Sequence, residues 1–180
     1  MLPTRLFRFY NKSVHQWPYV TQSLQTALLM TVGDIISQLI AEKKYYSQMN
    51  FNRSIKFGST GLVIGPILCK WYHILDKVNN GSLKLTFIKK IALDQLIFAP
   101  FAIAFITIFI AFIDGKTKNE IEIKLKRDYV DILCTNYKVW PIIQCINFSM
   151  VPLHHRVLVT QSIAVVWNAY LSWKINSNKT

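Results

Sequence analysis

Five long apolar stretches alternate with polar segments along the chain. They cover residues 18–40, 54–75, 91–113, 130–151 and 157–173. A helix needs about 20 residues to cross the hydrocarbon core of a bilayer. The last stretch contains no charged residue, whereas a water-soluble helix of this length would carry a polar face. The pattern therefore predicts an all-α, multi-pass transmembrane helical bundle with four to five membrane-embedded helices. The count depends on residues 130–151, which Lys138 and Trp140-Pro141 interrupt.

The first stretch has the pattern of a helix with two different faces. Its large apolar residues recur at steps of three and four and form one stripe: Leu24, Leu28, Val32, Ile35 and Leu39. Asp34 lies off this stripe, inside the stretch. A charge that faces lipid near the bilayer centre costs on the order of 2.5–3.5 kcal/mol on insertion scales. We therefore expect the stripe to face lipid and Asp34 to face the protein interior.

The segments between the stretches are predicted to be loops. Residues 42–53 are polar, residues 76–90 form a basic turn, and residues 116–128 carry charges of both signs. Apolar residues alternate in the last of these instead of recurring at helical spacing, so we expect a solvated linker. Residues 1–17 contain basic and apolar residues but no acid. They predict a short amphipathic helix on the membrane surface, or alternatively a mitochondrial targeting segment.

Composition agrees with a membrane protein of one domain. Apolar and aromatic residues make up 52% of the 180 residues, and only 17% are charged, against about 25% in soluble domains. The net charge is +12, but the basic residues lie mostly between the apolar stretches and no nucleic-acid-binding motif accompanies them. We predict a single integral membrane domain over residues 1–180 and no direct contact with nucleic acid. Basic residues divide almost equally between the two sides, so they do not predict an orientation.

Small residues in the second stretch indicate how helices pack. Gly58, Gly61 and Gly65 recur at steps of three and four and share one helix face. Small residues on one face let two helix backbones approach closely in lipid. We interpret these three glycines as a helix-packing surface.

Polar groups inside the apolar stretches are the candidate functional residues, because such groups are costly in a membrane. The candidates for a pore or polar seam are Asp34, Gln38, Lys70, Asp94, Gln95, Gln144, Asn147 and Arg156. Two interpretations remain open. The groups line a narrow aqueous path, or they pair with one another to lock the bundle, for example Asp34 or Asp94 with Arg156 or Lys70.

Motifs of enzymes and cofactor sites are absent from the sequence. It contains no GxGxxG, phosphate-binding loop, HExxH or GxSxG pattern. His154 and His155 are adjacent and do not share a helix face, which disfavours a metal site. We predict no enzymatic activity, no cofactor and no bound metal. A redox-sensitive pair formed by Cys134 and Cys145 stays open.

Several of these residues belong to a recognisable set of motifs along nearly the whole chain. The set comprises Gly33-Asp34 with Gln38, Gly65-Pro66 with Trp71-Tyr72 and Leu75-Asp76, Asp94-Gln95 with Ala99-Pro100, and a C-terminal group of Trp140-Pro141, Gln144, Asn147-Phe148, Val151-Pro152, Arg156, Trp167 and Tyr170-Leu171-Ser172-Trp173. In these positions the chain resembles the Mpv-seventeen and twenty-two-kilodalton peroxisomal membrane protein family. It is most similar to the mitochondrial inner-membrane branch, which includes fungal stress-response members.

The resemblance implies a small channel or metabolite pore of the mitochondrial inner membrane. It further implies roles in metabolite balance, membrane potential, mitochondrial DNA maintenance and stress response. The expected partners are the lipid bilayer, small metabolites or ions, and a homo-oligomer or inner-membrane complex. The alternative is a non-conducting scaffold that organises inner-membrane complexes. Pure protein would carry current in the first case, and would co-purify with stable partners in the second.

Overall fold

The protein is built from helices joined by short connections. The computed structural model describes residues 2–78, 81–150 and 153–177. Within these ranges it describes all side chains except those of residues 2–7, 11, 76, 83–84, 147–149, 153–161 and 177. The described residues contain helices and connections and no strand, which confirms the all-α class.

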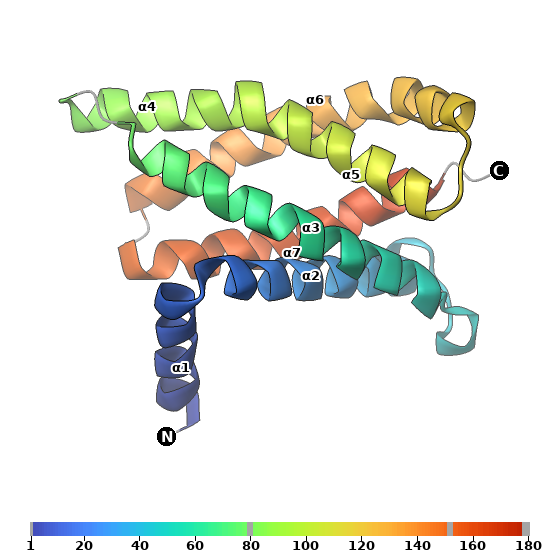
Figure 1. Ribbon diagram of the computed structural model, residues 1–180, viewed down its shortest axis with the longest axis horizontal. Coiled ribbons are helices and arrows are strands. Elements are labelled where there is room, and N and C mark those ends of the chain that lie inside the picture. Colours follow the sequence, from blue (N-terminus) through green and yellow to red (C-terminus); the bar gives the residue numbers. More distant parts are fainter. Residues whose placement is uncertain (1, 79–80, 151–152, 178–180) are drawn as a thin grey trace.

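The helices follow one another in a simple order (Figure 1). They are α1 (Leu2–Gln16), α2 (Pro18–Ile36), the π-helix η1 (Ser37–Ala41), the 3₁₀-helix η2 (Tyr46–Gln48), α3 (Phe51–Asp76), α4 (Leu83–Leu93), the π-helix η3 (Asp94–Phe98), α5 (Ala99–Ile113), α6 (Lys118–Met150) and α7 (Leu153–Ser177). The two π-helices each continue directly from an α-helix. Such single π turns occur frequently at functional sites.

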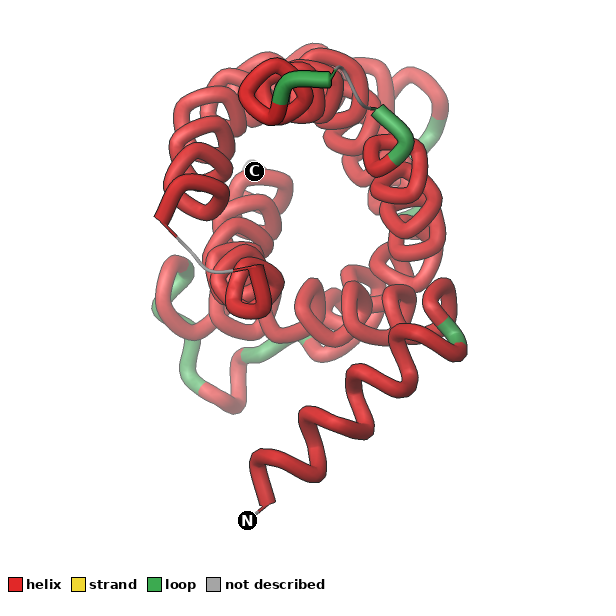
Figure 2. The backbone as a smooth tube through the Cα atoms, turned by 90° about the vertical axis from the view of Figure 1, so that its left-hand side faces the viewer, coloured by secondary structure: helices red, strands yellow, loops and turns green. Residues whose placement is uncertain are grey.

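Helices α2 to α7 run along the long axis of the molecule and surround a common interior (Figures 1 and 2). Helix α1 runs across this axis and projects from one end. Among the described residues, two helical stretches are long and apolar enough to cross a membrane, Pro18–Ala41 and Leu85–Ile113. Leu24, Leu28 and Leu39 of the predicted lipid-facing stripe are 60%, 64% and 43% exposed, whereas Asp34 is fully buried. The outer face of α2 therefore carries exposed leucines, and its buried face carries both the polar Asp34 and the apolar Met30.

The predicted linker at residues 116–128 is wrong, because α6 already begins at Lys118. The backbone N–H of Thr117 donates to the Glu120 carboxylate at 2.8 Å, and the Glu120 N–H donates to the Thr117 hydroxyl at 3.4 Å. This reciprocal arrangement is a capping box, which starts a helix by satisfying its first N–H groups. Ion pairs between Lys116 and Glu120 and between Glu122 and Lys126 add support at helical spacing. Similarly, α4 begins at Leu83, inside the predicted basic turn.

The glycine face of α3 packs against α2. A Cβ atom added at Gly61 would lie 2.6 Å from the Cα of Ala27, and one added at Gly65 would lie 2.6 Å from the Cα of Ser23. Gly58 faces Thr31 in the same way. No side chain larger than hydrogen fits at Gly61 or Gly65 without a shift of the backbone, and at Gly58 the Thr31 hydroxyl would have to move. The structure thus places all three predicted packing glycines in one interface.

Pro66 adds a polar contact to this interface. A proline inside a helix has no N–H, so the carbonyl four residues earlier loses its partner in the helix. That carbonyl belongs to Leu62, and it accepts a hydrogen bond from the Ser23 hydroxyl of α2 at 3.2 Å. The proline therefore creates an acceptor that the neighbouring helix satisfies.

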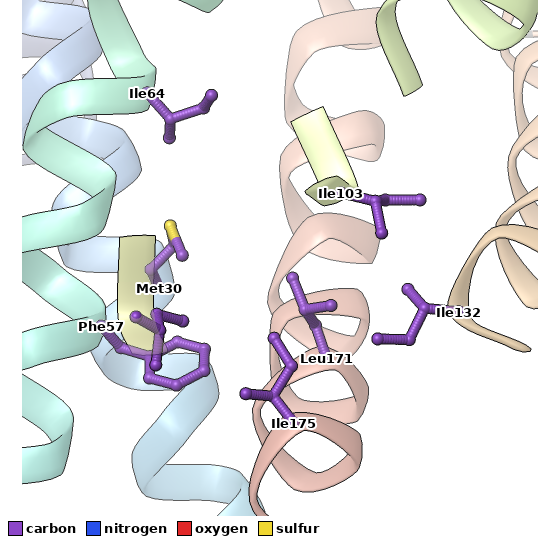
Figure 3. Close-up of a cluster of buried hydrophobic side chains, with 8 residues drawn as sticks. Met30, Phe57, Ile64, Ile103, Ile132, Leu171 and Ile175 are labelled. Carbon is purple, nitrogen blue, oxygen red and sulfur yellow. The ribbon is translucent and has the colours of Figure 1, made fainter. Parts of the chain in front are cut away.

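An apolar core fills the middle of the bundle (Figure 3). It consists of eight buried side chains drawn from all the long helices: Met30, Phe57, Ile64, Ile103, Ile110, Ile132, Leu171 and Ile175. Each is at most 3% exposed. Polar groups lie along the helices on both sides of this apolar core, and they form the two sites described next.

Candidate functional site

Asp34 is the centre of a buried polar network between α2, α3 and α7. One carboxylate oxygen accepts hydrogen bonds from Arg53 Nε at 2.8 Å and from the Ser172 hydroxyl. The other accepts from the Ser54 hydroxyl at 2.6 Å and from Gln38 Nε2 at 2.9 Å. The side chain of Asp34 is fully buried and that of Arg53 is 9% exposed. Charges this deep are tolerated because each has an opposite charge and further hydrogen bonds.

The network also holds the connection between α2 and α3. Arg53 Nη2 lies 2.7 Å from Glu42 in a second ion pair. Gln38 exchanges hydrogen bonds with the backbone of Asn50, donating to its carbonyl at 3.1 Å and accepting from its N–H at 2.7 Å. Burial opposes ionisation of Glu42, but its ion pairs with Arg53 and Lys44 outweigh this effect and lower the pKa of the carboxyl from its ordinary value of 4.5. All of these groups lie at one end of the bundle, where they hold the connection between α2 and α3 in place.

A second polar chain crosses from α3 through η3 to α6. The Asp94 carboxylate accepts hydrogen bonds from Trp71 Nε1 and from Gln95 Nε2, both at 3.0 Å. Gln95 Oε1 in turn accepts from Asn136 Nδ2 at 2.8 Å. Every donor to the Asp94 carboxylate in this chain is a neutral group. Asp94 thus differs from Asp34, whose carboxylate faces a guanidinium.

The second chain lies in the wall of a partly open chamber of about 180 Å³. Polar side chains from α2, η3, α6 and α7 line it: Gln22, Thr26, Asp94, Gln95, Asn136, Gln144 and Asn168. Aromatic rings supply another part of the wall: Tyr72, Phe98, Trp140 and Trp167. A space of this size holds several water molecules or a small solute. The chamber thus combines free space with polar groups inside the bundle.

The apolar core closes the chamber on the side of Asp34. Met30, Ile64, Ile103 and Leu171 belong both to the chamber wall and to the core. Asp34 lies one helical turn beyond Met30 on α2, and it does not line the chamber. An apolar layer therefore separates the chamber from the Asp34 network.

The candidates from the sequence fall into distinct groups. Asp34 and Gln38 belong to the buried network, and Asp94, Gln95 and Gln144 line the chamber. Lys70 is exposed and does not contact Asp34, whose cationic partner is Arg53. The side chains of Asn147 and Arg156 lie outside the described residues, as do those of His154 and His155.

The geometry corrects the loop assignment of Arg53 and answers the open question about Cys134 and Cys145. Arg53, assigned to a polar loop, is buried in the first turn of α3, where Asn50 caps the helix through a 3.0 Å hydrogen bond from Arg53 N–H. The asparagine before an apolar stretch is a helix-start signal that could have placed Arg53 correctly. Cys134 and Cys145 are exposed and lie on the same helix. Eleven residues of helix span about 16 Å, which is too far for a disulfide bond between them.

Metal coordination has no candidate in the part of the chain that is described. There, no group of three or more histidine, cysteine, aspartate or glutamate side chains converges.

These features define a class of protein: an all-helical bundle with an apolar exterior and buried charge, suited to a membrane. Residues 111–172 match the model of the Mpv17 / PMP22 family. The chain is 41% identical to the mitochondrial inner membrane protein Mpv17 of Xenopus laevis over 96% of this chain and 98% of that protein. It is 39% identical to the human protein of that name (94% and 97%) and 35% identical to protein sym-1 of Neurospora crassa (93% and 98%). The chain belongs to the Mpv17 / PMP22 family, as the sequence motifs indicated. No solved structure matches it.

Proposed function

We propose that this protein is a small channel or metabolite pore of the mitochondrial inner membrane, built as a multi-pass bundle of four to five membrane-embedded helices. The relatives named above support the location, since two of them are named mitochondrial inner membrane proteins. Flux through such a pore would contribute to metabolite balance and membrane potential, and through them to mitochondrial DNA maintenance and stress response. The protein acts without enzymatic chemistry in this proposal.

The chamber is the observation that carries the proposal. Polar side chains within a membrane bundle are costly unless they pair or face water. The Asp34 network pairs its groups completely on the carboxylate side, as a structural element would. The chamber instead leaves polar atoms facing free space, which is the property that a solute path requires.

The apolar layer gives the proposed pore a closed state. A narrow apolar constriction excludes water and thereby blocks ions, even where the passage on either side is polar. Met30, Ile64, Ile103 and Leu171 occupy this position between the chamber and the Asp34 end. Opening requires these side chains to separate, and the α2–α3 pair is too closely packed at its glycines to supply the movement. We therefore assign the movement to α5 and α7.

Reconstitution tests the proposal. Purified protein in a planar bilayer should carry single-channel currents, and Asp94→Asn should alter their ion selectivity, because it removes a charge from the chamber wall. Asp131→Asn is the matched control, since Asp131 is exposed on α6 and pairs with Lys174. Asp34→Asn is expected to affect folding more than selectivity, because Asp34 lies outside the chamber. A folded protein that carries no current would overturn the proposal and favour the non-conducting scaffold, which predicts stable co-purifying partners.

A further inference from the structure

We propose that the chamber binds a small organic ammonium ion, with the Asp94 carboxylate as its counter-ion. This inference names the solute class of the proposed pore and so rests on the proposed function. Binding can nevertheless be measured without conduction, which keeps the two proposals separable. Three independent properties of the chamber support the inference: its charge, its aromatic wall and an amide without a partner.

The chamber contains one carboxyl group, that of Asp94, and no cationic side chain of its described wall pairs with it. Among the lining residues no lysine, arginine or histidine is found, and Asp94 is the only carboxylate. Trp71 and Gln95 each donate an N–H to a different oxygen of this carboxylate. Burial opposes ionisation of this carboxyl, and the two hydrogen bonds favour it. The outer loops are basic and the net charge is +12, so the chamber has the opposite electrostatic preference to the surface.

Aromatic rings in the chamber wall suit an organic cation rather than a bare metal ion. Trp71 stacks on Phe98 with ring centroids 5.2 Å apart, and Trp140 meets Trp167 edge-on at 6.1 Å. Phe98, Trp140 and Trp167 line the chamber. The faces of aromatic rings attract alkylated ammonium groups and also bury their carbon atoms. An inorganic ion would lose its hydration shell against these rings and gain few ligands in return.

Gln144 supplies a further acceptor for the bound molecule. Its side chain lines the chamber, is 9% exposed, and has no hydrogen-bond partner among the described residues. An amide that lines free space and has no protein partner is available to a bound molecule or to water. Asn136 is already engaged with Gln95, which leaves Gln144 as the free amide on α6. An ammonium group has three N–H donors, so Asp94 and Gln144 can each accept one.

The size of the chamber limits the solute. A volume of about 180 Å³ is below the range of roughly 300–1,000 Å³ for pockets that hold drug-sized ligands. A primary amine with a short alkyl chain is of suitable size. The chamber is expected to reject the same carbon chain carrying a carboxylate, because that charge would face Asp94.

Titration calorimetry on the full-length protein in detergent tests the inference, with n-butylammonium as the probe. The neutral control is n-butanol and the anionic control is butyrate, each with four carbon atoms. We expect saturable binding of n-butylammonium alone. Asp94→Asn should weaken binding at least about tenfold, since it removes one partner of a buried charge pair, and Asp131→Asn should leave it unchanged. Gln144→Leu should weaken it by a smaller factor. This second variant disrupts no existing hydrogen bond, so it keeps the test valid if Asp94→Asn fails to fold.

Each other outcome overturns either this inference or the proposed function. Equal binding of n-butanol would show that the chamber recognises only the alkyl chain. Tighter binding of butyrate, or of potassium ions, would assign the chamber to a different class of solute. Absence of n-butylammonium binding by a protein that conducts in bilayers would refute the ammonium site while the channel proposal stands. Binding without any conductance would leave the site and refute the channel.

Discussion

Arg53 and Asp34 form a buried ion pair, with Nε 2.8 Å from Oδ1, across the interface between α3 and α2. Arg53 follows Asp34 by nineteen positions in the chain, and the short helices η1 and η2 lie between them. Because Asp34 also binds Ser172, the pair joins three helices at one end of the bundle. Its geometry leads to the first prediction.

Arg53→Gln should destabilise the protein by about 3–5 kcal/mol, because it leaves the Asp34 carboxylate buried without a cation. The measurement is the free energy of unfolding in mixed detergent micelles. Lys70→Gln removes the same charge from an exposed position on the same helix and serves as the control. If both variants unfolded alike, the ion pair would have no structural role.

Ser172→Ala should have a smaller effect than Arg53→Gln. The hydroxyl of Ser172 is fully buried and donates to Asp34, and a hydrogen bond to a charged group contributes about 1.5–3 kcal/mol. Three other donors remain on the carboxylate in the variant. Ser59→Ala, where the hydroxyl bonds only the carbonyl of Lys56 in its own helix, is the comparison. An equal loss of unfolding free energy in the two variants would contradict the assigned role of Ser172.

Glu42 should make the stability of the protein dependent on pH in mildly acidic solution. Its pKa is lowered in the folded state by Arg53 and Lys44, despite partial burial. The carboxylate therefore stabilises the fold above the ordinary pKa of 4.5, and this contribution is lost as the pH falls through the lower folded pKa. Thermal unfolding between pH 6 and pH 3 measures the effect, and Glu42→Gln should flatten the curve in its lower part. A variant curve parallel to that of the native protein would refute the linkage.

Gly61→Leu should separate α2 from α3. A Cβ at this position would lie 2.6 Å from Ala27 Cα and 2.8 Å from the Thr26 carbonyl oxygen, so the backbones must move apart. Overpacking of this kind typically costs about 1–3 kcal/mol. Val63→Leu enlarges a side chain that is 41% exposed on the same helix, and it should be tolerated. The free energies of unfolding of the two variants are compared. Equal values would contradict the tight contact at Gly61.

Ile103→Asn should increase the resting leak of the proposed pore. Ile103 belongs to the apolar layer beside the chamber and is 3% exposed, and a polar side chain there would let water enter the constriction. Open probability in planar bilayers at fixed voltage measures the change. Ile103→Val keeps the layer apolar and should behave like the native protein. An unchanged open probability in a folded Ile103→Asn protein would place the constriction elsewhere.

Local patterns predicted much of the architecture. The step of three and four between Gly58, Gly61 and Gly65 correctly identified one face of a helix, because that spacing alone decides which residues share a face. The position of Asp34 off the apolar stripe likewise predicts that it faces the protein interior, where the structure places it. In the structure Gln38 Nε2 donates to Asp34 across one turn, as residues four apart in a helix can.

Other features depend on tertiary contacts that no local pattern records. Arg53 belongs to a polar stretch by composition, and its burial results from meeting Asp34 of another helix. The residues after Gly115 were assigned to a linker because their apolar positions alternate. A helix forms there because Thr117 and Glu120 cap it and because charged pairs cover its exposed face. The chamber is harder still to predict from the sequence, since its wall comes from five separate helices and the π-helix η3.

The hydrogen bond from Ser23 to the Leu62 carbonyl fixes the register between two helices. The acceptor is available at one place only along this side of α3, four residues before Pro66. Sliding α2 by one turn would bring a residue other than Ser23 opposite that oxygen, and it would also move Ala27 away from the groove at Gly61. Neither helix can satisfy this carbonyl alone. During insertion, the hairpin of α2 and α3 can thus dock in its final alignment before the later helices emerge, and it offers them a preformed template.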